Sequence, residues 1–237
     1  MRIASKLALM LFIGALHGCA FTTETIDINY LPEPGVSKVA GAESVAVAVE
    51  VTDSRQDRSR VSSKKNGYGM ETAPILANED VAATVRRALT EEIRARGYQS
   101  ATAQADVQVN ALVTRFYNDH KLGFFSGDAV ADFNMTVKVV GDANRELFSR
   151  TIASEGKEAN TQLATGANAK RALDKALANG MRTLFADPAF IAALSSHAKA
   201  TVSTDKTGHL LEELAADKTL SPEEYKRRYE IIRRNQN

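Results

Sequence analysis

The 237-residue sequence contains one cysteine, so the chain cannot form an internal disulfide and offers no thiolate cluster for a structural zinc ion. An excess of charge of one sign is also missing, because 30 lysine and arginine residues stand against 29 aspartate and glutamate residues. Such a balance gives no strong field that would favour nucleic acid as a partner. With 44% hydrophobic residues the chain can still bury a core, and packing must supply its stability.

Common catalytic motifs are missing as well. The sequence has no Gly-x-Ser-x-Gly nucleophile elbow, no Walker phosphate loop and no Gly-x-Gly-x-x-Gly after a predicted strand. Beyond the N-terminal segment, the histidines are His120, His197 and His209, and none has a metal ligand at a suitable spacing. We therefore expect no enzyme activity, no cofactor and no metal site.

The single cysteine, Cys19, lies where an export signal would end. Arg2 and Lys6 precede a short apolar run over residues 7–16, which is too short to span a bilayer. The sequence therefore predicts a cleaved export signal ahead of Cys19. An ordinary secretory signal followed by a chance cysteine is the alternative.

The mature chain is predicted to start with a tether over residues 19–41, in which alternation over 25–30 allows one edge strand. The main domain is expected over 42–198. Its first strand is the alternating valine run of 43–51, followed by a long polar loop over 53–70. A helix is predicted from Val81 to Gly97, because apolar residues recur there at helical spacing after Asp80.

Alternating apolar and polar residues predict three further strands, over 107–116, 131–139 and 147–153, with a turn at 141–144. A second helix is expected over 168–185, and a short one through residue 193. The order β-α-β-β-β-α favours an α+β domain with helices packed on a mainly antiparallel sheet.

The C-terminal region is predicted to be separate. A polar linker over 199–208 leads to a helical hairpin over 209–237, in which Tyr225, Tyr229 and Ile232 share one helix face. About 28 residues are too few for an independent core. The hairpin should therefore dock on the main domain, on a second copy of itself or on a partner.

Two stretches of the main domain are candidate interaction sites. Asp53 and Arg55 directly follow the most apolar strand, where they form either a polar site or an ion pair that fixes the strand exit. Phe124 and Phe125 lie between glycines in a predicted hairpin loop. They either contact a partner or a membrane, or fold back onto the core.

Several of these stretches resemble known bacterial sequences. Residues 16–19, Leu-His-Gly-Cys, resemble a lipobox. The resemblance implies a signal peptide over residues 1–18, a mature chain that begins at Cys19, lipidation of Cys19 and stable anchoring by several acyl chains. Ala20 in the following position implies the outer membrane, with the protein facing the periplasm. Together with Val51–Arg55, Ala95–Tyr98 and Val107–Val109, the lipobox resembles the YajG-type lipoproteins over residues 19–193, a family without accepted catalytic residues. The tail resembles the short helical-hairpin module called SHOCT, which implies oligomerisation or protein contact.

Three functions are compatible with the sequence. The first is a non-enzymatic binding or scaffold protein for an envelope component, anchored in the outer membrane. In this interpretation the hairpin contacts an envelope protein or a second copy of the chain. The second is a carrier of lipid or another small ligand, which needs an apolar cavity between sheet and helices. The third is a cell-envelope hydrolase that uses Asp53, for which a second titratable group must converge.

Overall fold

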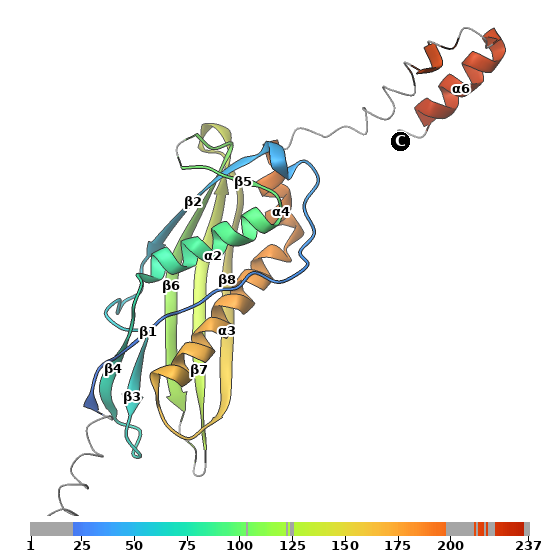
Figure 1. The fold of residues 1–237 in the computed structure, drawn as a ribbon. Helices are drawn as coiled ribbons and strands as arrows, with labels where there is room; N and C mark the ends of the chain where they lie inside the picture. The colour runs from blue at the N-terminus through green and yellow to red at the C-terminus, as the bar shows by residue number, and fades with distance from the viewer. Residues whose placement is uncertain are drawn as a thin grey trace, which may run out of the picture. The chain divides into compact units, whose positions relative to one another are not determined.

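The structure is a computed structural model that describes residues 21–102, 104–121, 123, 126–197, 211, 213–215, 217 and 221–234. The described residues fall into two compact units, divided after His197. The first unit has the expected α+β architecture, with helices on one face of a sheet (Figure 1).

The main sheet has five strands in the order β5-β2-β6-β7-β8. The strands are β2 (Ala46–Asp53), β5 (Gln99–Ser100), β6 (Val107–Lys121), β7 (Gly127–Val140) and β8 (Glu146–Thr161). β2 runs parallel to β5 and β6, and the long strands β6, β7 and β8 form an antiparallel meander. A bulge between Val113 and Arg115 shifts the inward face of β6, so that Phe116, Asn118 and His120 are buried beyond it.

Three helices cover one face of this sheet: α2 (Val81–Ala95), α3 (Gly166–Phe185) and α4 (Pro188–Leu194). Asp80 caps α2 by accepting a hydrogen bond from the Ala83 N–H at 3.1 Å, as the sequence predicts. α3 lies unusually close to the sheet. A Cβ on Gly156 of β8 would lie 2.1 Å from the Ala172 carbonyl oxygen, and one on Gly180 would lie 2.6 Å from the Phe133 ring. Contacts this close leave no space between α3 and these strands.

A second sheet, with the order β1-β4-β3, lies beside the main one: β1 (Glu24–Ile26), β3 (Ser62–Lys65) and β4 (Glu71–Ala77). The expectation of one long loop over 53–70 is wrong, because β3 lies inside it. The Asn118 N–H donates to the Val61 carbonyl at 2.8 Å, which joins this sheet to β6. β1 pairs in parallel with β4, so residues before position 30 belong to the folded domain.

The segment that follows β1 runs beside α2 and crosses α3 on the outer side of that helix (Figure 1). Ile26, Ile28 and Tyr30 are buried, and the Asn29 N–H donates to Asp174 Oδ1 at 2.9 Å. The described part of residues 19–41 is therefore packed against the domain over much of its length.

The strands give the first unit two ends. The basal end comprises the start of β1, the β3–β4 turn at residues 66–70 and the β8–α3 loop at 162–165. The apical end comprises the start of β2, the β7–β8 turn at 141–145 and the short helix η4 (Ser195–His197). β8 has 16 residues and runs from one end to the other, which corresponds to about 50 Å.

The second unit contains α6 (Pro222–Arg234), and residues 211 and 213–215 are also helical. The Glu224 N–H donates to Ser221 Oγ at 3.3 Å, so Ser221 caps α6. Tyr225 and Tyr229 stack with their ring centroids 6.4 Å apart and are 39% and 37% exposed. Among the described residues of the whole chain, no helix is long and apolar enough to cross a membrane.

Candidate functional site

Asp53 and Arg55 form a closed ion pair at the end of β2. Arg55 Nη2 lies 2.9 Å from Asp53 Oδ2, and both side chains are only 6% exposed. Asp53 Oδ1 also accepts the backbone N–H and Nε–H of Arg55, each at 3.0 Å. Both carboxylate oxygens are therefore engaged by one guanidinium.

The remaining N–H groups of Arg55 are directed at backbone oxygens. Nη1 donates to the carbonyls of Arg60 at 3.0 Å and Phe116 at 3.2 Å, and Nη2 donates to that of Arg58 at 3.4 Å. The pair thus ties the exit of β2 to the following loop and to β6. Of the two sequence interpretations, this geometry matches the ion pair that fixes the strand exit.

The other residues singled out in the sequence belong to the second unit or lie outside the described residues. Tyr225 and Tyr229 belong to the second unit, where they present stacked rings on α6. Cys19, Phe124 and Phe125 lie outside the described residues.

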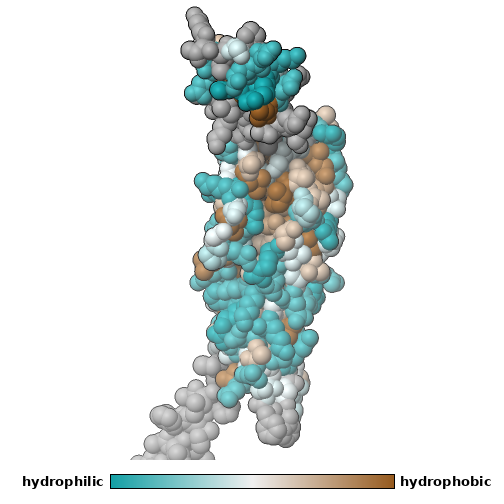
Figure 2. Space-filling view, turned by 90° about the vertical axis from the view of Figure 1, so that its right-hand side faces the viewer, coloured by the Kyte–Doolittle hydropathy of each residue, from teal (hydrophilic) through white to brown (hydrophobic). Residues whose placement is uncertain are grey.

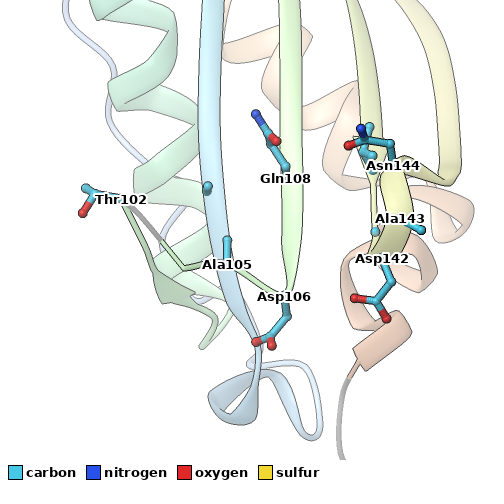
Figure 3. Close-up of a pocket in the computed structure, with 10 residues that line it drawn as sticks. Thr102, Ala105, Asp106, Gln108, Asp142, Ala143 and Asn144 are labelled. Carbon is cyan, nitrogen blue, oxygen red and sulfur yellow. The ribbon is translucent and has the colours of Figure 1, made fainter.

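The structure instead shows a polar depression at the apical end, which we call the apical groove (Figure 3). It has a volume of about 410 Å³ and lies between the outer face of β2 and β6 and the β7–β8 turn. It is lined by Ala48, Thr102, Ala105, Asp106, Gln108, Val140, Gly141, Asp142, Ala143 and Asn144.

Hydrogen bonds fix the floor of this groove. The Ala46 N–H donates to Asp106 Oδ2 at 2.7 Å, and Gln108 Nε2 donates to Glu50 at 3.2 Å and Asn110 at 3.0 Å. At the rim, Asp142 is 79% exposed and its Oδ2 lies 3.5 Å from His197 Nε2. The groove therefore offers amide groups and a carboxylate to a ligand and has no nucleophile paired with a base.

The β7–β8 turn that closes the groove has an unusual backbone. Ala143 and Asn144 have φ values of 53° and 58°, and the Arg145 N–H donates to the Asp142 carbonyl at 3.0 Å. Positive φ at both central positions is the pattern of a type I′ turn, in which asparagine is common and alanine is not. The sequence does predict the turn, but not its left-handed alanine.

A buried polar cluster under the N-terminal segment could not be recognised in the sequence. Tyr30 donates its hydroxyl proton to Glu92, which also pairs with Arg96 on the same helix, and the Arg96 guanidinium lies 4.2 Å from the Phe185 ring centroid. Burial, together with the Glu92 carboxylate, raises the pKa of Tyr30 well above its usual range. The cluster joins residue 30 to α2 and the end of α3, and all its members are satisfied within the protein.

His120 is another buried polar residue without a sequence signal. Its side chain is on the inward face of β6, the residue is 2% exposed, and neither ring nitrogen has a hydrogen-bond partner. Burial and the nearby Lys65 lower the pKa of His120 to about 4, against the smaller opposing effects of Asp119 and Glu24. The ring is therefore neutral at pH 7. No group of three or more metal-binding side chains occurs among the described residues.

Comparison with known families identifies the chain. A family model described as "uncharacterized lipoprotein" matches residues 32–195. The chain belongs to this family. It is the YajG-type family that the sequence resembles, and membership in a lipoprotein family suggests a membrane-anchored envelope protein. No curated protein matches the chain.

Solved structures that match the chain come from several bacteria. A protein from Xanthomonas campestris is 13% identical with a TM-score of 0.49, and the match covers 76% of this chain and 99% of that one. A candidate lipoprotein from Caulobacter crescentus is 14% identical, covers 65% and 93%, and has a TM-score of 0.39. A minor lipoprotein from Acinetobacter baumannii is 8% identical, covers 64% and 92%, and has a TM-score of 0.36.

Proposed function

We propose that this lipoprotein is a non-enzymatic scaffold of the bacterial envelope that holds a protein-binding surface away from the membrane. In this proposal Cys19 carries the lipid, the outer membrane holds the anchor and the domain faces the periplasm. A partner protein of the envelope binds at the apical end, and the C-terminal hairpin adds a contact to that partner or to a second copy of the chain.

The observation that carries the proposal is the placement of the two chain ends on the first unit. β1 begins at the basal end, only five residues after Cys19, whereas the unit ends with His197 at the apical end. The strands between these ends span about 50 Å. A lipid at Cys19 would therefore hold the basal end at the bilayer and the apical end far from it.

The apical surface suits a protein partner. The apical groove presents hydrogen-bonding amides and an exposed carboxylate, which can pair with the backbone and basic side chains of a protein. Figure 2, a view from the side of α3 and β8, shows a largely hydrophilic unit whose apolar residues gather towards the apical end. Mixed polar and apolar surfaces of this kind are typical of protein interfaces.

The two alternatives have less support from the described residues. A carrier needs an apolar cavity between sheet and helices, but Gly156 and Gly180 bring α3 into direct contact with the strands. A hydrolase that uses Asp53 needs a free carboxylate and a converging second group, but both oxygens of Asp53 are bound by Arg55.

Site-specific photo-crosslinking in cells tests the apical contact. A photoreactive amino acid at Asn144 should give an adduct with an envelope protein, identified by mass spectrometry. The matched control is Arg171 on α3, which is 52% exposed and lies towards the basal end. Adducts of equal yield from both positions, or from neither, would contradict the proposal.

The hairpin contact is tested separately. We expect the double substitution Tyr225→Ala and Tyr229→Ala to reduce crosslinking or self-association as strongly as deletion of residues 209–237. Arg227→Ala is the control, because its side chain is 74% exposed and its ion pair with Glu224 is weak at 3.7 Å. An assembly state that survives both the deletion and the double substitution would exclude the hairpin as a contact.

A further inference from the structure

Large apolar side chains are exposed together at the basal end of the first unit. Tyr68 is 92% exposed, Leu163 70%, Phe21 67% and Met70 59%. Among the described residues of this unit, only two other large apolar side chains are comparably exposed, Leu31 and Leu112. We call the four basal residues the basal patch.

Three separate segments contribute to the basal patch, and their contacts hold them at one end. Tyr68 and Met70 lie in the β3–β4 turn, where Asn66 Oδ1 accepts the N–H groups of both residues at 3.0 and 3.1 Å. Lys65, next to this turn, donates to Asp119 and to the His120 carbonyl near the end of β6. The turn is therefore fixed to the main sheet.

Glu24 connects the other two segments. It lies three residues after Phe21, accepts a hydrogen bond from the Gly166 N–H at 3.0 Å and pairs with Lys64 at 3.2 Å. Leu163 is in the loop just before Gly166, where its carbonyl accepts from Asn168 Nδ2 at 2.8 Å. Phe21, Leu163 and the β3–β4 turn thus belong to one built surface.

Most charged groups around the basal patch are paired with one another, and Lys121, close to Tyr68, adds one exposed positive charge. The pairs are Lys65–Asp119 at 2.5 Å, Lys157–Asp128 at 2.6 Å, Arg60–Glu71 at 2.6 Å and Lys64–Glu24 at 3.2 Å. Each pair brings one positive and one negative charge, so this end has little net attraction for an anionic surface. Its apolar side chains are the feature that a partner would recognise.

We propose that the basal patch inserts into the interfacial layer of the bilayer that holds the lipid anchor. This inference rests on the proposed anchoring at Cys19. Phe21 is two residues from Cys19, a separation of at most about 7 Å, so a lipid on that cysteine brings the patch to the membrane surface. Aromatic and apolar side chains are favourable at the boundary between headgroups and acyl chains. The domain is then held by two attachments and keeps its apical end directed away from the membrane.

The sequence offers a direct test, because it contains no tryptophan and one cysteine. The chain from Cys19 to Asn237 is coupled through that cysteine to a maleimide lipid in phosphatidylcholine vesicles, which imposes the anchor without cellular lipidation. Tyr68→Trp then places a single fluorophore in the basal patch. Leu112→Trp is the matched control on the open face of the main sheet, where Leu112 is 40% exposed.

We expect lipids brominated on their acyl chains to quench the reporter at position 68 about twofold or more and to leave the one at position 112 unchanged. Added salt should alter the result little, because most of the local charges are paired. Equal quenching at both positions, no quenching at position 68, or quenching that requires anionic lipid would each overturn the inference.

A second measurement does not depend on a reporter. Uncoupled chain with Tyr68→Ser, Met70→Ser and Leu163→Ser should bind phosphatidylcholine vesicles at least about tenfold more weakly than the unsubstituted chain. The Leu112→Ser variant should bind like the unsubstituted chain. Equal binding by the unsubstituted chain, the triple variant and the Leu112→Ser variant would overturn the inference. Because the apical partner is tested by crosslinking in cells, these vesicle results can fail while the proposed scaffold stands, and the reverse also holds.

Discussion

The Glu24 carboxylate accepts a hydrogen bond from the backbone N–H of Gly166 at 3.0 Å, across 142 positions of sequence. Gly166 is the first residue of α3, so the negative charge lies at the positive end of the helix dipole and satisfies a free N–H. A Cβ at position 166 would lie 2.4 Å from Glu24 Oε1, which accounts for glycine there. The residues nearest the proposed anchor are thereby joined to the longest helix.

Removing this contact should weaken the domain measurably. We expect Glu24→Ala to lower the free energy of unfolding by about 1–2 kcal/mol, because the Gly166 N–H and Lys64 both lose their partner. Urea denaturation of the mature chain measures it. Glu33→Ala is the control, since its ion pair with Arg182 is about half exposed and should contribute less than about 0.5 kcal/mol. Equal effects of the two substitutions would contradict the role of Glu24.

The close approach of α3 to β8 makes Gly156 a sensitive position. Gly156→Ala would bring a methyl group within 2.1 Å of the Ala172 carbonyl oxygen and 2.3 Å of the Ala176 nitrogen, both of which are backbone atoms. We expect a loss of about 3 kcal/mol or more, measured by urea denaturation. Gly67→Ala, where nothing lies within 4 Å, should change stability by less than about 0.5 kcal/mol. A mild effect at position 156 would show that α3 can shift.

The depressed pKa of His120 predicts how stability depends on pH. The ring titrates near pH 6.5 in the unfolded chain and near 4 in the folded one, so the unfolded state binds the proton first as the pH falls. The contribution of the neutral His120 ring to the free energy of unfolding is therefore fully present above pH 6.5. It declines as the pH falls from 6.5 to 4 and is lost below pH 4. The total change is about 3 kcal/mol.

His120→Leu should remove this component of the pH dependence. The unsubstituted protein must be compared with His120→Leu for two reasons. Lys65, Asp119 and Glu24 also act on the His120 ring. Carboxylates with a lowered pKa, such as Asp128, cause a further loss of stability at more acidic pH. Urea denaturation at several pH values should show a difference in stability between the two proteins that grows as the pH falls from 6.5 to 4. Parallel curves would mean that the His120 ring finds a proton acceptor in the folded state.

Much of the main domain could be predicted from periodicity. The alternation in β2, β6 and β7 and the stripes of α2 and α3 are strong because each element has one face in the core and one in water. In the small second sheet, β1 overlaps the edge strand allowed over 25–30, but β3 and β4 escaped prediction for physical reasons. β3 reads Ser-Ser-Lys-Lys, and its buried serines are satisfied by long-range partners, as when Ser62 Oγ donates to the Asn118 carbonyl at 2.9 Å. β4 contains Pro74, which usually argues against a strand.

The candidate sites were harder to predict than the fold. Asp53 and Arg55 could be recognised as a polar pair by their place after a strand. Only the geometry shows that the N–H groups of Arg55 donate to one carboxylate and three backbone carbonyls. The apical groove joins residues near 48, 106 and 142, which are brought together by strand pairing. Long-range contacts of this kind leave no local pattern in the sequence.

The left-handed Ala143 predicts a stabilising substitution. Alanine at a φ of 53° pays a steric penalty of about 1 kcal/mol that glycine avoids, so Ala143→Gly should raise the free energy of unfolding by a similar amount. Ala153→Gly, in the exposed face of β8, should lower it by about 0.5–1 kcal/mol, and thermal unfolding distinguishes the two signs. If both substitutions destabilise the protein, the turn is held in another conformation.

The buried Asp53–Arg55 pair predicts a different effect for single and paired substitutions. Asp53→Ala leaves a guanidinium in a site that is 6% exposed, so we expect a loss of about 3–5 kcal/mol. Replacing both residues, with Asp53→Leu and Arg55→Met, removes the unpaired charge and should recover part of that loss, although the carbonyls of Arg60 and Phe116 still lose their donor. Urea denaturation of both variants measures the difference. If the pair is structural, the double variant must be more stable than Asp53→Ala. If Asp53 instead serves chemistry, Asp53→Ala alone should leave the free energy of unfolding nearly unchanged.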